Sequence, residues 1–186
     1  HIERIDDRYG VRLAQLNLGH AYLQASWGDG RAASEASEAC GGDAQAQLGE
    51  RLAQAQRLLE TVSALSKQPE AGDDESAFRV DVVMSSLADA YLALLHLRLE
   101  QFEAAMTCFA SAIAQDELAN AELGAAFERL GEELLLRAHW EEAMTAMEAS
   151  RAQHEGLGQH ATVRRLSRRM TELRNQMSSA ARHRES

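Results

Sequence analysis

One helical pattern occurs twice in this chain of 186 residues, 38 positions apart. Residues 101–112 read QFEAAMTCFASA and residues 139–150 read HWEEAMTAMEAS. In each copy an aromatic residue is followed three positions later by alanine, and four positions further on by a large apolar residue. This spacing places all three on one side of a helix. A pair of helices repeated at such a period cannot bury its apolar side alone, so the pattern predicts pairs that stack on one another.

The composition agrees with a purely helical chain. Ala, Leu, Glu, Arg and Gln dominate, and all of them favour helices; proline occurs once, at Pro69, and aromatic residues make up 5%. With 45% apolar residues and no dense runs of β-branched residues, the prediction is an all-α fold. The periodicity predicts helices over residues 3–25, 44–67, 77–98, 102–115, 118–137, 140–155 and 160–181. The segment WGDG at 27–30 is expected to end the first helix, residues 31–43 to form a loose loop or a frayed helix, and residues 68–76 to form a linker.

Small residues recur where two helices of a pair would meet. Residues 89–100 (DAYLALLHLRLE) align with 127–138 (FERLGEELLLRA), which places Ala93 opposite Gly131. Ala105 and Ala143 provide the small side chains on the second helices, and such residues let two backbones approach closely. Large residues, Phe109, Phe127 and Trp140, are expected to fill the space between them. A weaker copy of the first half is QLNLGHAYL, Gln15–Leu23.

This pattern resembles the tetratricopeptide repeat (TPR) family. The resemblance implies antiparallel helix pairs stacked as a solenoid of about three units, with a capping or coiled-coil helix at the C-terminal end. It implies a repeat domain over residues 1–159, made of a degenerate first unit (1–67), the linker (68–76) and two well-formed units (77–159), followed by a basic helix over 160–186. The chain departs from the family in its period, which is 38 rather than 34, and in lacking the glycine before the turn aromatic, where Glu100 and Ala138 stand instead.

The resemblance also implies a concave surface lined by the first helix of each pair. The inward positions are Leu13, Leu16, His20 and Leu23 in the first unit, Leu87, Ala90, Leu94, Leu97 and Arg98 in the second, and Ala125, Glu128, Glu132, Leu135 and Leu136 in the third. This groove is mostly apolar, so one interpretation is that it binds a protein or peptide partner such as an amphipathic helix. The favoured alternative is that these leucines pack against the chain's own extra helix or a second copy, because large exposed apolar patches are unusual.

The last helix carries apolar residues at steps of three and four. These heptad positions are Val163, Leu166, Met170, Leu173 and Met177. They predict a helix that caps the last pair, a seam between two copies in a homodimer, or both, with the first turns capping and the rest pairing. A helical array followed by such a helix resembles the N-terminal sensory region of bacterial signalling proteins, in which an output domain such as a GGDEF diguanylate cyclase follows.

Charge is divided unevenly along the chain. Residues 160–186 contain seven arginines and two glutamates, whereas the whole chain has a net charge of −10. The acidic part argues against nucleic-acid binding.

We expect no membrane span, because an uninterrupted apolar run of sufficient length is missing. The two cysteines fit neither a disulfide framework nor a metal motif. A cytoplasmic protein is therefore expected. The excess of arginine (18 residues) over lysine (one) suggests a GC-rich bacterial genome.

Motifs for chemistry are not evident. Neither a phosphate-binding glycine loop nor a nucleophile elbow nor a zinc-protease motif occurs in the sequence, and His154 and His160 across a loop are weak evidence for a metal site. We expect no cofactor, no metal and no catalysis. The predicted function is a non-catalytic interaction or regulatory domain, the sensory or dimerisation module of a larger signalling protein. The alternative is a freestanding adaptor or secretion-type chaperone that binds an apolar client segment in the groove.

Overall fold

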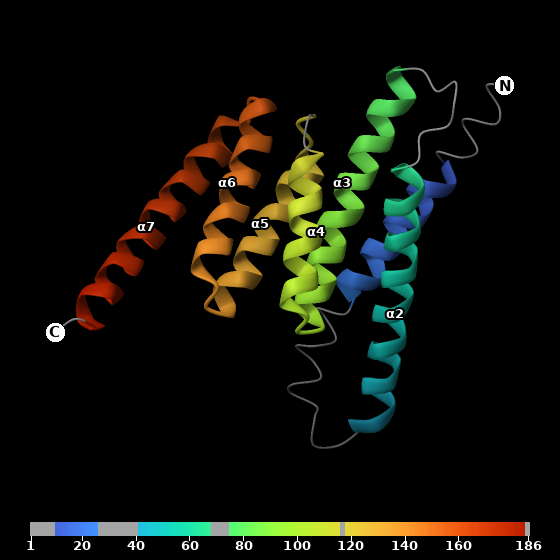
Figure 1. Cartoon of the computed structure of the whole chain (residues 1–186), viewed down its shortest axis with the longest axis horizontal. Coiled ribbons are helices and arrows are strands. Elements are labelled where there is room, and N and C mark those ends of the chain that lie inside the picture. The colour runs from blue at the N-terminus through green and yellow to red at the C-terminus, as the bar shows by residue number, and fades with distance from the viewer. Residues whose placement is uncertain (1–9, 26–40, 68–74, 116–117, 185–186) are drawn as a thin grey trace. The chain divides into compact units, whose positions relative to one another are not determined.

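The computed structural model describes residues 10–25, 41–67, 75–115 and 118–184 (Figure 1). Every regular element in these ranges is an α-helix, which confirms the expected all-α class. A helix covers residues 10–25. The others are α2 (Gly41–Ser66), α3 (Glu75–Arg98), α4 (Phe102–Ala114), α5 (Ala121–Leu136), α6 (Trp140–Gly156) and α7 (His160–Arg184).

The helix bounds follow the sequence pattern to within three residues, and the largest differences are at the starts of α2 and α5 and at the end of α7, which continues to Arg184 rather than to residue 181. Helix α5 begins at residue 121 rather than 118, because Asn120 is extended and its side chain accepts hydrogen bonds from the backbone N–H groups of Glu122 and Leu123. This is the usual arrangement of a helix N-cap. Helix α2 begins at Gly41 rather than at residue 44, in the part of the chain for which a loose loop or a frayed helix was expected. The rest of that loop, the expected break at 27–30 and most of the linker at 68–76 lie outside the described residues.

The chain divides into two compact units, His1–Gln115 and Asp116–Ser186. Unit 1 contains the helix over 10–25 with α2, α3 and α4, and unit 2 contains α5, α6 and α7. The division lies after Gln115, and the boundary predicted between residues 159 and 160 falls within unit 2. Helix α7 packs against α6 and belongs to unit 2, because its apolar positions are covered there.

Close helix packing in unit 2 depends on a glycine. Gly131 of α5 is buried, and a Cβ atom at this position would lie 2.9 Å from Cγ of Met147 and 3.2 Å from the backbone oxygen of Ala143, both on α6. Ala143 and Phe127 have no exposed surface. The small residues expected at this helix pair are thus buried where the two backbones approach.

The same kind of contact occurs in unit 1, between the helix over 10–25 and α2. A Cβ atom at Gly19 would lie 3.0 Å from Cδ2 of Leu59 and 3.5 Å from the backbone oxygen of Ala55. Ala55 and Leu59 are four residues apart, like Ala143 and Met147, and both are fully buried. Helix α2 therefore packs closely against the helix over 10–25 at this glycine, within the segment 1–67 that the sequence analysis treats as a degenerate first unit.

Helix α3 lies at the centre of unit 1, where α2 and α4 both pack against it. Its stretch Arg79–Arg98 is long and apolar enough to cross a membrane, with a hydropathy of 1.4, and 78% of that stretch is buried inside the chain. It also carries Asp81 and Asp89, which are 6% and 2% exposed and are bonded to other helices of the unit. These are the features of the core helix of a folded domain.

Three helices end in the same hydrogen-bonded turn, at Glu100, Ala138 and Gly158. These residues have φ angles of 59°, 61° and 66°. In each turn the next backbone N–H donates to the carbonyl five residues before it, Gln101 to His96, His139 to Leu134 and Gln159 to His154, at 2.8 to 3.0 Å. This is the Schellman motif, which normally has glycine at the left-handed position. The glycine expected from the TPR pattern is absent at 100 and 138, yet the backbone adopts the conformation that favours it.

Substituting glycine at either position should stabilise the protein. A side chain in the left-handed region costs about 1–2 kcal/mol, which glycine avoids. The greater conformational entropy of glycine in the unfolded state offsets part of this stabilisation. We therefore expect Glu100→Gly and Ala138→Gly each to raise the free energy of unfolding by about 0.5–1 kcal/mol, measured by urea denaturation. Gly158→Ala is the converse control and should lower it. A loss of stability in both glycine variants would contradict this account of the turns.

Candidate functional site

The residues predicted to line a groove in unit 1 are mostly interior. Leu16, Leu23, Leu87, Ala90, Leu94 and Leu97 are at most 4% exposed. Leu13 is 36% exposed, and His20 and Arg98 are half-buried. The ring of His20 stacks on that of Tyr91, with centroids 4.1 Å apart. The apolar residues therefore form the core of unit 1 and do not line an open surface.

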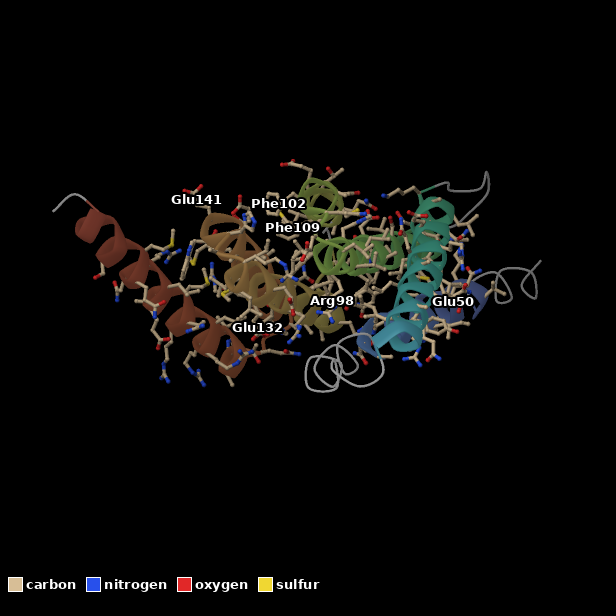
Figure 2. All side chains as sticks on the ribbon, turned by 90° about the horizontal axis from the view of Figure 1, so that it is seen from below. Glu50, Arg98, Phe102, Phe109, Glu132 and Glu141 are labelled. Atoms are coloured by element: carbon tan, nitrogen blue, oxygen red, sulfur yellow. The ribbon has the colours of Figure 1, made fainter. Side chains whose placement is uncertain are left out.

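In unit 2, helix α7 covers part of the predicted groove. Leu135 of α5 packs against the buried cluster of Met147, Met170 and Leu173, and Glu128 is bonded to Arg165 of α7. Three further predicted residues are exposed, namely Ala125, Leu136 and Glu132, the last of which is labelled in Figure 2. Helix α7 thus covers Leu135 and contacts Glu128, whereas the other three predicted residues of this unit stay exposed.

The heptad positions of α7 face the same cluster. Leu166, Met170 and Leu173 are at most 3% exposed, and Val163 and Met177 are half-buried. Three of the five residues predicted as a dimer seam are therefore enclosed by unit 2 itself. The physical reason is that Met144, Met147 and Leu135 offer them an apolar surface within unit 2.

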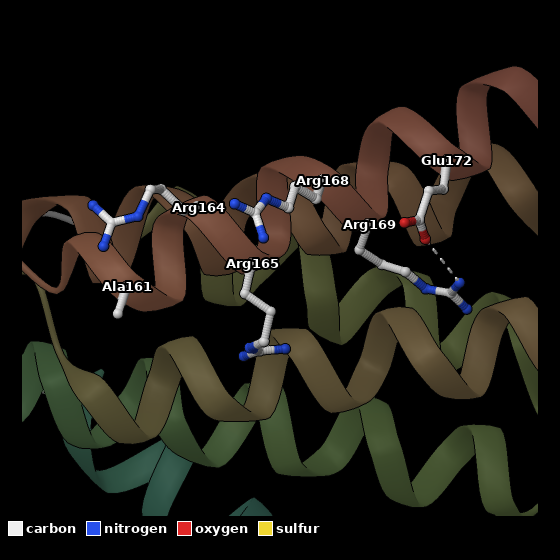
Figure 3. A pocket seen from close by; sticks show the side chains of 6 residues that line it. All are labelled: Ala161, Arg164, Arg165, Arg168, Arg169 and Glu172. Atoms are coloured by element: carbon white, nitrogen blue, oxygen red, sulfur yellow. Dashed lines mark ion pairs between the residues drawn. The ribbon is translucent and has the colours of Figure 1, made fainter.

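The other side of α7 presents arginine. Arg164, Arg165, Arg168 and Arg169 lie along one stripe of the helix, and with Ala161 and Glu172 they line a shallow hollow of about 380 Å³ (Figure 3). We call these four arginines the arginine face. Each of the four is exposed. The heptad side of α7 is thus used for folding, while its charged side remains accessible.

Two members of the arginine face have carboxylate partners. Both terminal nitrogens of Arg165 donate to Glu128 of α5, one of them at 2.7 Å, and these hydrogen bonds raise the pKa of the Arg165 guanidinium. Nη1 of Arg169 lies 3.7 Å from Oε2 of Glu172 on the same helix, and a dashed line marks this ion pair in Figure 3. Beyond the hollow, Arg174 donates to Glu148 of α6 at 2.8 Å. Carboxylates are therefore the groups that this side of α7 already binds.

The densest polar cluster lies in unit 1, around the carboxylate of Asp89. It accepts hydrogen bonds from Ser63 (2.6 Å), Ser111 (2.6 Å), Lys67 (2.7 Å) and Gln115 (3.3 Å). Lys67 is the only lysine of the chain. The four donors come from α2, from α4 and from the residues that directly follow these helices, so the cluster ties both helices to α3. A buried carboxylate with this many donors serves to hold helices together.

Cys108 lies on α4 near this cluster and is poorly suited to act as a nucleophile. Burial, and then the negative charge of Asp89, raise the pKa of the Cys108 thiol to about 11. The thiolate is the reactive form, and its fraction at pH 8 is therefore very small.

This raised pKa predicts slow alkylation. At pH 8 the thiolate fraction of Cys108 is about 100-fold below that of a thiol with the ordinary value of 9.0, and the greater nucleophilicity of a basic thiolate offsets only part of this. We expect iodoacetamide to modify Cys108 at least about tenfold more slowly than N-acetylcysteine, followed by mass spectrometry of the Cys108 peptide. The rate should increase with pH until about pH 11. Equal alkylation rates of Cys108 and N-acetylcysteine at pH 8 would contradict the raised pKa of the Cys108 thiol.

The histidines considered for a metal site are arranged differently. Nδ1 of His154 is 2.7 Å from Oε1 of Gln159, across the turn at the end of α6. His154 is 6% exposed and packs against Gly124 of α5, whereas His160 is exposed. Within the described ranges, no three side chains of the metal-binding types come together. His96 and Gln101 form the same pair at the end of α3. His96 and His154 thus each bond to a residue just beyond the end of their own helix.

The arginine face was visible in the sequence as a basic run, but its orientation was not. The heptad pattern of α7 fits a capping helix and a dimer seam equally well, and only the packing of Met147 on α6 decides between them. No protein-family model, no curated protein and no solved structure matches the chain.

Proposed function

We propose that the chain is a non-catalytic, regulatory protein-interaction domain of the TPR type. The observation that carries this proposal is the recurrence of one local design. Helices α3 and α5 end 38 residues apart, at Arg98 and Leu136, and α4 and α6 begin 38 residues apart, at Phe102 and Trp140. Between them the backbone makes the same left-handed turn at Glu100 and Ala138. Repeated helix pairs of this kind build binding surfaces.

The polar chemistry of the described residues supports a scaffold. The carboxylate of Asp89 is occupied by donors that hold helices together, and the thiol of Cys108 is held in its protonated form. A carboxylate that acts in acid–base catalysis normally lies in an accessible cleft. A nucleophilic thiol normally has a lowered pKa. The polar groups are therefore used for folding.

The cellular setting is the second part of the proposal. The domain serves as the sensory module of a larger cytoplasmic bacterial signalling protein, with an output domain of the diguanylate cyclase type after α7. A partner bound to the domain would alter the position of α7 and thereby the output. The burial of Leu166, Met170 and Leu173 within unit 2 supports a capping role for α7 over a seam between two copies.

The alternative of a freestanding adaptor or chaperone gains no support from the packing. Such a protein would need an open apolar groove, and the leucines predicted to form it in unit 1 are at most 4% exposed, with the exception of Leu13.

The reading frame of the native gene beyond the codon for Ser186 tests the cellular setting. A folded output domain joined directly to α7 is the expected result. A stop codon within a few residues of Ser186 would contradict the sensory-module proposal and leave a freestanding interaction protein in its place.

A further inference from the structure

Among the residues that the structure describes, two guanidinium groups of the arginine face have no carboxylate partner. In the described part of the chain, Arg165 is bonded to Glu128 and Arg169 to Glu172, but no acidic group forms an ion pair with Arg164 or Arg168. Figure 3 shows these two side chains beside each other, extending from the same side of α7. They are four residues apart, so they are neighbours on the helix surface.

This arrangement is unfavourable for the isolated helix. Like charges four residues apart destabilise a helix, and both Arg164 with Arg168 and Arg165 with Arg169 are such pairs. The first turn of α7 contains no acidic residue, so the positive end of the helix dipole precedes this cluster of positive charge. A local departure from favourable electrostatics is typical of a functional surface.

The chemistry of the surroundings selects the kind of partner. The apolar side of α7 is buried, so the helix cannot insert that side into a lipid bilayer. The net charge of the whole chain, −10, disfavours the extended negative surfaces of nucleic acids and anionic membranes. A short acidic segment avoids most of that repulsion, and the neighbouring arginines already bind carboxylates.

We propose that the arginine face of α7 binds an acidic helical segment of a protein partner, with Arg164 and Arg168 each receiving one carboxylate. Carboxylates spaced three or four residues apart on the partner helix would match the spacing of these two arginines. The inference rests on the proposed function in that both describe a protein-binding domain, but it concerns this surface alone.

Binding to a designed peptide tests the proposal with the full chain. The probe is a fluorescein-labelled, alanine-based helical peptide with glutamates three and four residues apart on one side, and the matched peptide has glutamine at those positions. Fluorescence anisotropy should show binding of the glutamate peptide only. The variant Arg164→Gln/Arg168→Gln should weaken this binding about 10- to 30-fold, and its thermal midpoint should stay the same or increase, because a repulsive pair has been removed.

The variant Arg57→Gln/Arg151→Gln is the matched control. It removes the same charge from two arginines outside the arginine face, whose partners are Gln54 and Glu155 on their own helices, and its affinity should stay within about twofold. Equal losses in the two double variants would reduce the effect to net charge and overturn the proposal.

Other outcomes would also overturn it. These are equal affinity for the two peptides, no binding of the glutamate peptide up to about 1 mM, or tighter binding of vesicles containing phosphatidylglycerol or of duplex DNA. Self-association of the chain that Arg164→Gln/Arg168→Gln abolishes would identify a second copy as the occupant instead. Failure of peptide binding leaves the gene-structure test of the proposed function unaffected.

Discussion

Replacing Gly131 by leucine is expected to lower the free energy of unfolding by about 3 kcal/mol or more, since overpacking of a tight core typically costs 1–3 kcal/mol and occasionally exceeds that. A Cβ atom alone would lie 2.9 Å from Cγ of Met147 and 3.2 Å from the backbone oxygen of Ala143. The methionine side chain can move, but the backbone oxygen moves only with helix α6. Helices α5 and α6 would therefore have to separate, and urea denaturation followed by circular dichroism would measure the loss.

Ala125→Leu is the matched control on the same helix. Ala125 is exposed, so the added side chain meets solvent, and stability should change by less than about 0.5 kcal/mol. If Gly131→Leu proved as stable as Ala125→Leu, the two helices would not approach each other at this glycine.

Replacing Asp89 by alanine is expected to cost unit 1 about 2–3 kcal/mol. The substitution leaves four donors without their acceptor, among them the buried hydroxyl of Ser63 and the hydroxyl of Ser111. Lys67 can turn to solvent because its side chain is 41% exposed. The expected loss of stability is therefore smaller than for a fully enclosed ion pair. Chemical denaturation of the full chain would measure the effect.

Asp89→Asn and Glu50→Ala separate the causes of that loss. Asparagine retains one acceptor oxygen and should lose less than alanine, whereas removing an exposed acid from α2 should change stability by less than about 0.5 kcal/mol. If Asp89→Ala were as mild as Glu50→Ala, the carboxylate would not be what holds α2 and α4 to α3.

The sequence predicted the helices well because their apolar residues keep a strict period. Phe102, Ala105 and Phe109 repeat as Trp140, Ala143 and Met147, and both sets lie on helices within a residue or two of the predicted bounds. Ala105 and Ala143 are fully buried, as close packing requires. Trp140, in contrast, is 38% exposed, so it contributes less to the interior than its size suggested.

The pairing of α2 shows less clearly in the sequence because its spacing differs. The prediction places it in a degenerate first unit over residues 1–67. Leu52, Ala55 and Leu59 repeat the same large, small, large pattern, but Ala55 follows Gly19 by 36 residues, whereas Ala143 follows Gly131 by 12. The 38-residue period therefore does not extend to this pair, although the glycine contact in the structure is of the same kind.

The candidate site was predicted less well, because periodicity says which residues share a helix side and not what that side contacts. Leu87, Leu94 and Leu97 share a side of α3 as expected, yet they are interior. The heptad of α7 was likewise correct as a pattern, and its partner surface turned out to belong to the same chain. A buried carboxylate with four donors, Asp89, carries no sequence signal beyond an acid within an apolar helix.

The account depends most on the packing of α7 against its own unit, because this leaves the arginine face outward. The most direct test is urea denaturation of the unmodified chain at two concentrations differing about 100-fold. If Leu166, Met170 and Leu173 are buried within one chain, as the structure has them, the midpoint should not change. If they instead joined two copies, the apparent stability would increase by about 2.7 kcal/mol over that range, and such a shift would contradict the account.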